Sequence, residues 1–117
     1  MKYIVNRKIY NTDNDLLLAT VYDINDVPKY LLRDIFHIGP FGAPRFMSGT
    51  LFFYRSAIDS VHYIVVRNLL IKYLTAGEDL VNDQLFSLSI DQALELSQSL
   101  FRVDTVIRLF NDHLTEV

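Results

Sequence analysis

The sequence predicts an α+β fold, in which an antiparallel sheet of about five strands is built from hairpins and two C-terminal helices pack on one face or at one edge. Runs of aromatic and β-branched residues, separated by short turns, fill most of the first two thirds of the chain. Two apolar stripes with helical spacing follow a helix-start signal near the end. With 117 residues, half of them hydrophobic, residues 1–117 are expected to form a single domain.

The first half of the chain predicts two hairpins. Tyr3–Asn11 and Leu16–Tyr22 are rich in β-formers, and the four turn residues between them predict a hairpin. Thr50–Arg55 and Val61–Arg67 predict a second hairpin, closed by the five residues 56–60. Lys29–Ile38 is open between a helical turn and a strand.

The second half predicts one more strand and three helical segments. Leu69–Leu74 is expected to be a short helix that ends before a glycine, and Gln84–Leu88 a strand. Ser89–Gln92 fits a capping box, so a helix should start at Ile90. A last helix follows Arg102, with an apolar stripe that recurs every three or four positions: Val103, Val106, Ile107, Phe110 and Leu114.

Composition and charge exclude several classes of protein. The chain contains no cysteine, so disulfides, thiolate nucleophiles and Cys-ligated metals are excluded. A net charge of −3 argues against a protein that neutralises a nucleic-acid backbone. Neither a secretory signal at residues 1–8 nor a membrane-spanning run is recognisable, and we expect a cytoplasmic protein that binds no membrane and no nucleic acid directly.

No motif for catalysis or for a cofactor is present. The glycines at residues 39–42 lack the Gly-Lys-Ser/Thr ending of a phosphate loop. His37, His62 and His113 have no metal-ligand spacing, and we expect them to be ordinary surface or hydrogen-bonded histidines. The sequence therefore predicts a protein that is no enzyme and takes no cofactor or metal.

The segment 39–49 is unusually apolar for a loop. It holds three of the four glycines and two of the three prolines, together with the candidate partner-binding residues Phe41, Arg45, Phe46 and Met47. Aromatic residues, Met and Arg are enriched at the centre of protein interfaces. The alternative is that Phe41 and Phe46 pack under the sheet as a satellite core.

The charge is unevenly distributed along the chain. Residues 1–75 hold nine Lys/Arg and six Asp/Glu, or +3, whereas residues 76–117 hold two and eight, or −6. These acidic residues either solubilise the C-terminal helices or form a secondary docking face for a basic partner. The candidates for such a face are Glu78, Asp79, Asp83, Asp91 and Glu95.

Over nearly its full length the chain resembles a group of small proteins from bacteria and their phages or plasmids. The resemblance is carried by Lys8–Thr12 leading into Leu17–Ala19, by Leu51–Arg55 before an aromatic strand, and by Phe86–Ala93 before a final helix. It implies a mobile-element accessory protein, and in particular an anti-CRISPR-like inhibitor of a host defence nuclease. The sequence departs from the group across residues 27–49, where the group has a shorter and more polar connection.

These observations favour a non-enzymatic protein-binding module, with a bacterial defence nuclease such as a CRISPR effector as its partner. The alternative is a homo-oligomeric structural or assembly protein of a phage or plasmid that pairs with itself through the same apolar surface. A third hypothesis is a small enzyme that uses His62 or Asp59.

Overall fold

The computed structural model describes residues 1–37, 44–73 and 77–117, and it confirms the α+β fold. A five-stranded antiparallel sheet has the order β3-β4-β5-β6, and β7 pairs with another stretch of β5; β1 and β2 form a separate two-stranded sheet. The elements are β1 (Lys2–Val5), β2 (Lys8–Asn11), β3 (Leu16–Val21), η1 (Ile24–Asp26), α1 (Lys29–Phe36), β4 (Pro44–Arg55), β5 (His62–Tyr73), β6 (Glu78–Val81), β7 (Gln84–Ser87), α2 (Ile90–Leu100), α3 (Val103–Phe110) and η3 (Asn111–His113).

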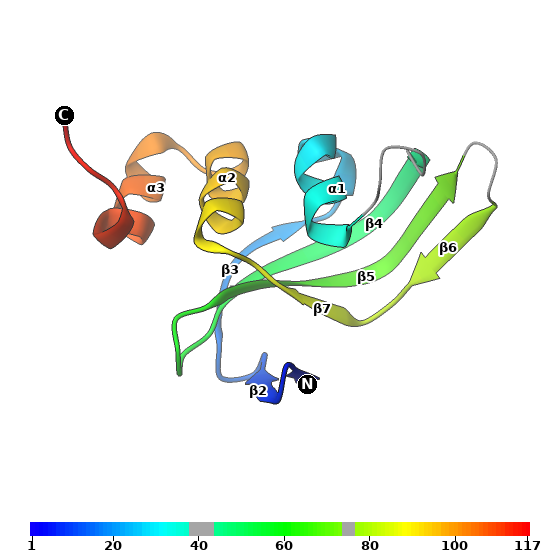
Figure 1. Ribbon diagram of the computed structural model, residues 1–117, viewed down its shortest axis with the longest axis horizontal. Coiled ribbons are helices and arrows are strands. Elements are labelled where there is room, and N and C mark those ends of the chain that lie inside the picture. The colour runs from blue at the N-terminus through cyan, green and yellow to red at the C-terminus, as the bar shows by residue number, and fades with distance from the viewer. Residues whose placement is uncertain (38–43, 74–76) are drawn as a thin grey trace.

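The large sheet carries the helices on one face and the small sheet against part of the other (Figure 1). The helices α1, α2 and α3 lie in a row on one side, and the small sheet lies on the other. The main core fills the space under the helices and includes Leu32, Phe53, Ile64 and Leu96. A second core of Tyr10, Tyr63, Val65 and Leu85 lies under the small sheet. The large sheet is therefore the middle layer of the molecule.

The predicted N-terminal hairpin, which pairs Tyr3–Asn11 with Leu16–Tyr22, is wrong. β1 pairs with β2, and β3 pairs with β4. The chain turns at Asn6 and Arg7, whose φ angles of 51° and 66° are both positive, as a two-residue type I′ hairpin turn requires. Because Arg occupies a position where glycine is usual, the sequence gives only a weak signal for this turn.

The second predicted hairpin is confirmed and is longer than expected. β4 and β5 have 12 residues each and pair along their length. The predicted helix at 69–74 is wrong over the described residues Leu69–Tyr73, which continue β5. Leu69–Lys72 pair with β6. Leu69 and Ile71 are buried while Lys72 is exposed, so the segment has the two-residue period of a strand.

A β-bulge bends the hairpin in its middle. Ser48 pairs with Leu70 and Thr50 with Arg67, so that Gly49 opposes two residues, Asn68 and Leu69. A Cβ atom on Gly49 would lie 2.9 Å from the Cα atom of Leu69, and the φ angle of Gly49 is +145°. Glycine is required here by both the conformation and the close approach of the two backbones.

The helices begin where the sequence predicts. Ser89 and Gln92 form both hydrogen bonds of the capping box, and α2 begins at Ile90. α3 buries Val106 and Phe110. The ambiguous segment after residue 28 is a helix from Lys29 to Phe36, and it ends at His37 in the left-handed conformation.

We expect Gly49→Ala to lower the free energy of unfolding by about 2–4 kcal/mol, because the new Cβ clashes with the Leu69 backbone in an unfavourable conformation. Gly77→Ala is the matched control, since Gly77 also has a positive φ of +81° but has no atom within 4 Å of the added Cβ. That variant should lose about 1 kcal/mol. Urea unfolding measures both values, and equal losses would contradict the steric explanation.

Candidate binding surfaces

The structure separates the four residues predicted to bind a partner. Phe41 lies outside the described residues, and Arg45 lies on β4 with its side chain outside the description. Residues 44–49 are part of β4, so the predicted loop is wrong over this part. Met47 is 2% exposed and belongs to the main core, whereas Phe46 is 47% exposed. Side chains alternate along a strand, and so Met47 faces the helices and Phe46 faces away from them.

Phe46 lies on a mixed rather than an apolar surface. Its ring is 6.0 Å from the Nζ atom of Lys72, its neighbour in the register. Lys72, Tyr73, Gly77 and Glu78 line a shallow hollow beside it. Phe46 is not sealed beneath neighbouring strands, and it remains available for contact.

The five acidic candidates fall into two groups. Glu78 and Asp79 lie on β6, and Asp83 follows it, with its carboxylate 3.7 Å from Nε of Arg67. Asp91 and Glu95 lie on α2 and face a hollow of about 280 Å³ between α1 and α2. The structure therefore brings Asp91 and Glu95 together with Asp34 of α1, which the sequence analysis did not include.

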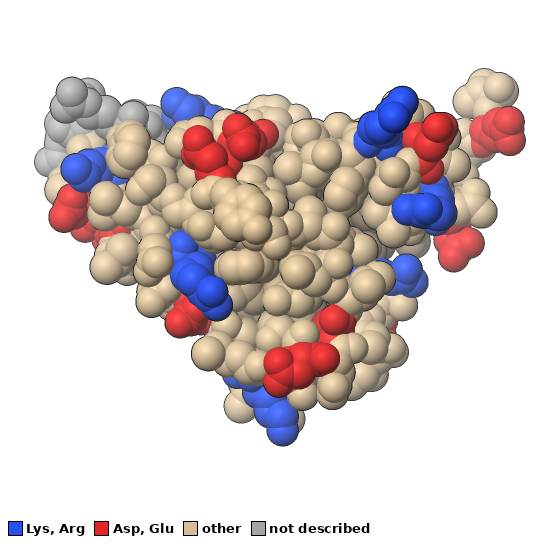
Figure 2. Space-filling model, turned by 180° about the vertical axis from the view of Figure 1, so that it is seen from behind, with Lys and Arg blue, Asp and Glu red and all other residues tan. Residues whose placement is uncertain are grey.

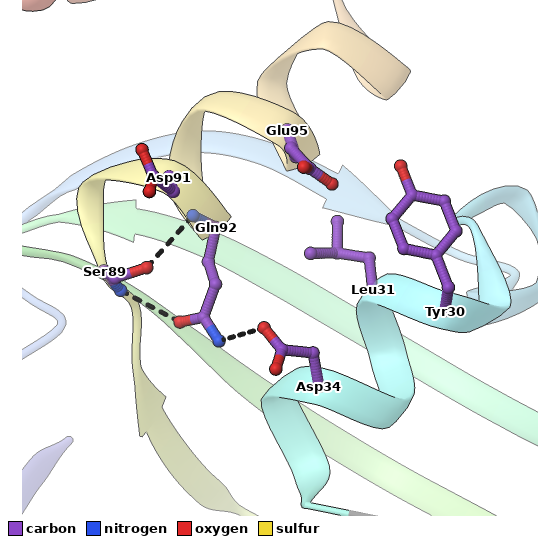
Figure 3. Close-up of a pocket in the computed structure, with 7 residues that line it drawn as sticks. All are labelled: Tyr30, Leu31, Asp34, Ser89, Asp91, Gln92 and Glu95. Atoms are coloured by element: carbon purple, nitrogen blue, oxygen red, sulfur yellow. Dashed lines mark hydrogen bonds between the residues drawn. The ribbon is translucent and has the colours of Figure 1, made fainter. Parts of the chain in front are cut away.

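Figure 3 shows this acidic hollow between α1 and α2. The Nε2 atom of Gln92 donates a 2.8 Å hydrogen bond to Asp34, and its backbone N–H donates to Oγ of Ser89. A hydrogen bond to the Glu95 carboxylate raises the pKa of the Tyr30 hydroxyl. Oγ of Ser89 accepts the helix-cap hydrogen bond, and the carboxylates of Asp34, Asp91 and Glu95 are exposed.

A second hollow, of about 310 Å³, lies between α2 and α3 and is apolar. We call it the α2–α3 groove; its lining consists of Leu94, Gln98, Phe101, Val103, Val106, Ile107 and Leu114. Val103 is 72% exposed and Ile107 is 48% exposed. Both residues belong to the apolar stripe predicted for the last helix. Only part of that stripe is covered.

Charged residues do not gather in one patch on the face shown in Figure 2. Lys and Arg side chains alternate with Asp and Glu around its margin, and uncharged residues occupy much of the middle. A basic face for a phosphate backbone is therefore not visible on this side. Within residues 1–37, 44–73 and 77–117, no helix is long and apolar enough to cross a membrane, and no group of three or more His, Asp or Glu could hold a metal ion.

His62 is neither a surface histidine nor a hydrogen-bonded one, in contrast to the expectation. It is 5% exposed, and neither ring nitrogen has a hydrogen-bond partner among the described residues. Its ring stacks on Phe110 of α3 at 4.9 Å and lies 5.8 Å from Phe53. Burial lowers its pKa to about 4, and the nearby Arg55 and His113 act in the same direction. The neutral ring serves as a core aromatic group.

Comparison with protein-family models, with curated proteins and with solved structures gives no match for this chain. Of the resemblance to small mobile-element proteins, the structure supports the coarse part, which is a small α+β fold with a hairpin-built sheet and C-terminal helices. The functional interpretation therefore depends on the surfaces described above.

We expect the stability of the protein to fall as the pH drops from about 6.5 to about 4. Over this range the unfolded chain binds a proton at His62 that the folded chain excludes, since the folded pKa is about 4. The loss should approach ~3 kcal/mol. Urea unfolding at a series of pH values measures it.

His62→Phe provides the control for this pH dependence, because a phenyl ring retains the stacking but does not titrate. The variant should lose less stability than the wild type over the same pH range. Equal losses in both proteins would show that other groups cause the effect.

Proposed function

We propose that this chain is a non-enzymatic protein-binding module whose main contact is the α2–α3 groove. The observation that carries the proposal is the lining of the groove, in which six of seven residues are apolar. Covering apolar surface is favourable by roughly 25 cal/mol per Å². A partner that fills the groove would cover Val103, Ile107 and Leu114, which are 72%, 48% and 38% exposed.

The shape of the groove favours a helical partner. Two helices form its walls, and Gln98 is the polar group in a lining that is otherwise aliphatic or aromatic. Grooves of this kind accept the apolar face of an amphipathic helix, with side chains three or four positions apart as anchors. Val106, which also lines the groove, and Phe110 anchor α3 in the main core.

The absence of an assembled reactive group among the described residues supports binding over catalysis. His62 is sealed in the core, and Ser89 is bound as a helix cap. Asp59, the other residue of the enzyme hypothesis, lies on the β4–β5 turn and accepts hydrogen bonds from the Val61 N–H and the Lys8 ammonium. These hydrogen bonds give the Asp59 carboxylate a structural role.

We choose a bacterial defence nuclease, such as a CRISPR effector, as the first partner to test. The ground for this choice is the resemblance to mobile-element accessory proteins described in the sequence analysis. The sheet surface around Phe46 is the second candidate contact, since Phe46 is 47% exposed and lies beside Lys72. Aromatic residues such as Phe46 are enriched in protein interfaces.

The wild-type protein is expected to bind a purified defence nuclease and slow its cleavage of target DNA. Ile107→Asp should weaken that binding at least tenfold, or about 1.4 kcal/mol, because it places a charge in the apolar groove. Binding constants from calorimetry, together with cleavage rates, test both statements.

Ile58→Asp is the matched control, since Ile58 is 89% exposed on the β4–β5 turn, outside the residues that line the groove. It should bind like the wild type. Full binding by Ile107→Asp, with a loss in Phe46→Ala, would move the contact to the sheet surface. A wild-type protein that neither binds nor slows a panel of such nucleases would contradict the choice of partner.

A further inference from the structure

The outer edge of β3 is an unprotected edge of the large sheet. Among the described residues β3 pairs with β4 alone, so the backbone groups on its other side have no strand partner. Its six residues, Leu16–Val21, contain no charged residue and no proline. Leu16 is 57% exposed and Leu17 is 46% exposed. An apolar edge strand of this kind is a template for pairing with another strand.

The opposite edge of the sheet consists of β6 and β7, and β7 lies beside β1 of the small sheet. β6 carries Glu78 and Asp79 in four residues, and both are exposed. Two copies that paired through β6 would bring four carboxylates close together, and like charges across a strand pair are destabilising. β3 pairing with β3 brings only Leu, Ala, Thr and Val side chains together. The charges on β6 and the small sheet beside β7 leave β3 as the edge for self-pairing.

We propose that two copies of this chain associate by antiparallel pairing of their β3 strands, which joins the two large sheets into one continuous sheet. A twofold axis relates the copies, so the same backbone groups and side chains are used on both sides. Antiparallel pairing of identical strands is self-complementary, because each donor on one copy faces an acceptor on the other.

The size of the contact sets the expected affinity. A six-residue strand is about 20 Å long, and a bulge at Leu18 interrupts the regular part of β3. The interface is therefore expected to stay below about 1,200 Å², which is typical of weak and reversible complexes. We expect a dimer that forms at micromolar concentrations and dissociates on dilution.

Sedimentation velocity of the full chain, from low micromolar to submillimolar concentration, tests this proposal. The wild-type mass should rise from 13.6 kDa toward twice that value. Leu17→Lys should stay monomeric, because a lysine on the edge strand blocks pairing. The matched control is Leu80→Lys on β6, where Leu80 is 71% exposed; it should dimerise like the wild type.

A second measurement locates the dimer contact on the chain without disrupting it. Because the chain has no cysteine, Thr20→Cys on β3 carries a single spin label. Labels on two paired copies should show strong dipolar coupling, whereas labels at Ile58→Cys should not. A wild-type chain that stays at 13.6 kDa, or dimerisation that Leu80→Lys abolishes and Leu17→Lys retains, would overturn the proposal.

The self-association and the proposed function can fail separately. Ile107 lies in the α2–α3 groove, and Ile107→Asp should leave the sedimentation of the chain unchanged. If Ile107→Asp abolished dimerisation and Leu17→Lys did not, the two copies would meet through the groove, and pairing through β3 would be wrong.

Discussion

The pairing of β4 with β5 is the interaction on which the rest of the structure depends. Every other strand of the large sheet is bonded to one of these two: β3 to β4, and β6 and β7 to β5. Phe53 and Ile64 from this pair are fully buried beneath the helices, and Tyr63 is fully buried beneath the small sheet. Both cores therefore use side chains of the same hairpin, and neither core can form without it.

The bulge in this hairpin explains how one strand serves two partners on the same side. β7 pairs with Tyr63–Val66, and β6 pairs with Leu69–Lys72. The bulge residue Asn68 lies between these two stretches, and its backbone N–H donates a 3.0 Å hydrogen bond to Oδ1 of Asn82 in the β6–β7 connection. The bend in β5 and the turn from β6 to β7 therefore fix each other.

Local signals made part of this fold predictable. The aromatic strands on either side of residues 56–60, the strand at Gln84 and the capping box at Ser89 all appear in the structure, because each depends on neighbours in the sequence. β6 and the end of β5 escaped prediction because their pairing depends on the distant bulge at Gly49. The pairing of β3 with β4 instead of β2 has a similar cause, since nothing in Leu16–Val21 itself selects its neighbour.

The candidate sites were harder to predict than the fold, because they depend on which side chains are exposed. Met47 and Ile107 illustrate this. A single step along a strand moves a side chain to the other face, so Phe46 and Met47 have opposite environments although the sequence groups them. For Ile107 the stripe of α3 gives the period of the helix but not the amount of surface that its neighbours cover. α3 packs against α2 with part of its apolar stripe still exposed. Exposure of this kind depends on the whole arrangement of layers.

The acidic residues after position 76 also gain a physical explanation from the topology. Glu78 and Asp79 lie on the edge strand β6, where charged side chains keep a sheet from pairing with other chains. Asp91 lies in the first turn of α2, where a negative charge is stabilised by the helix dipole. These residues therefore have structural roles that need no basic partner. The contrast with β3 bears on self-association. This chain places charge on the edge strand β6 and leaves the edge strand β3 uncharged.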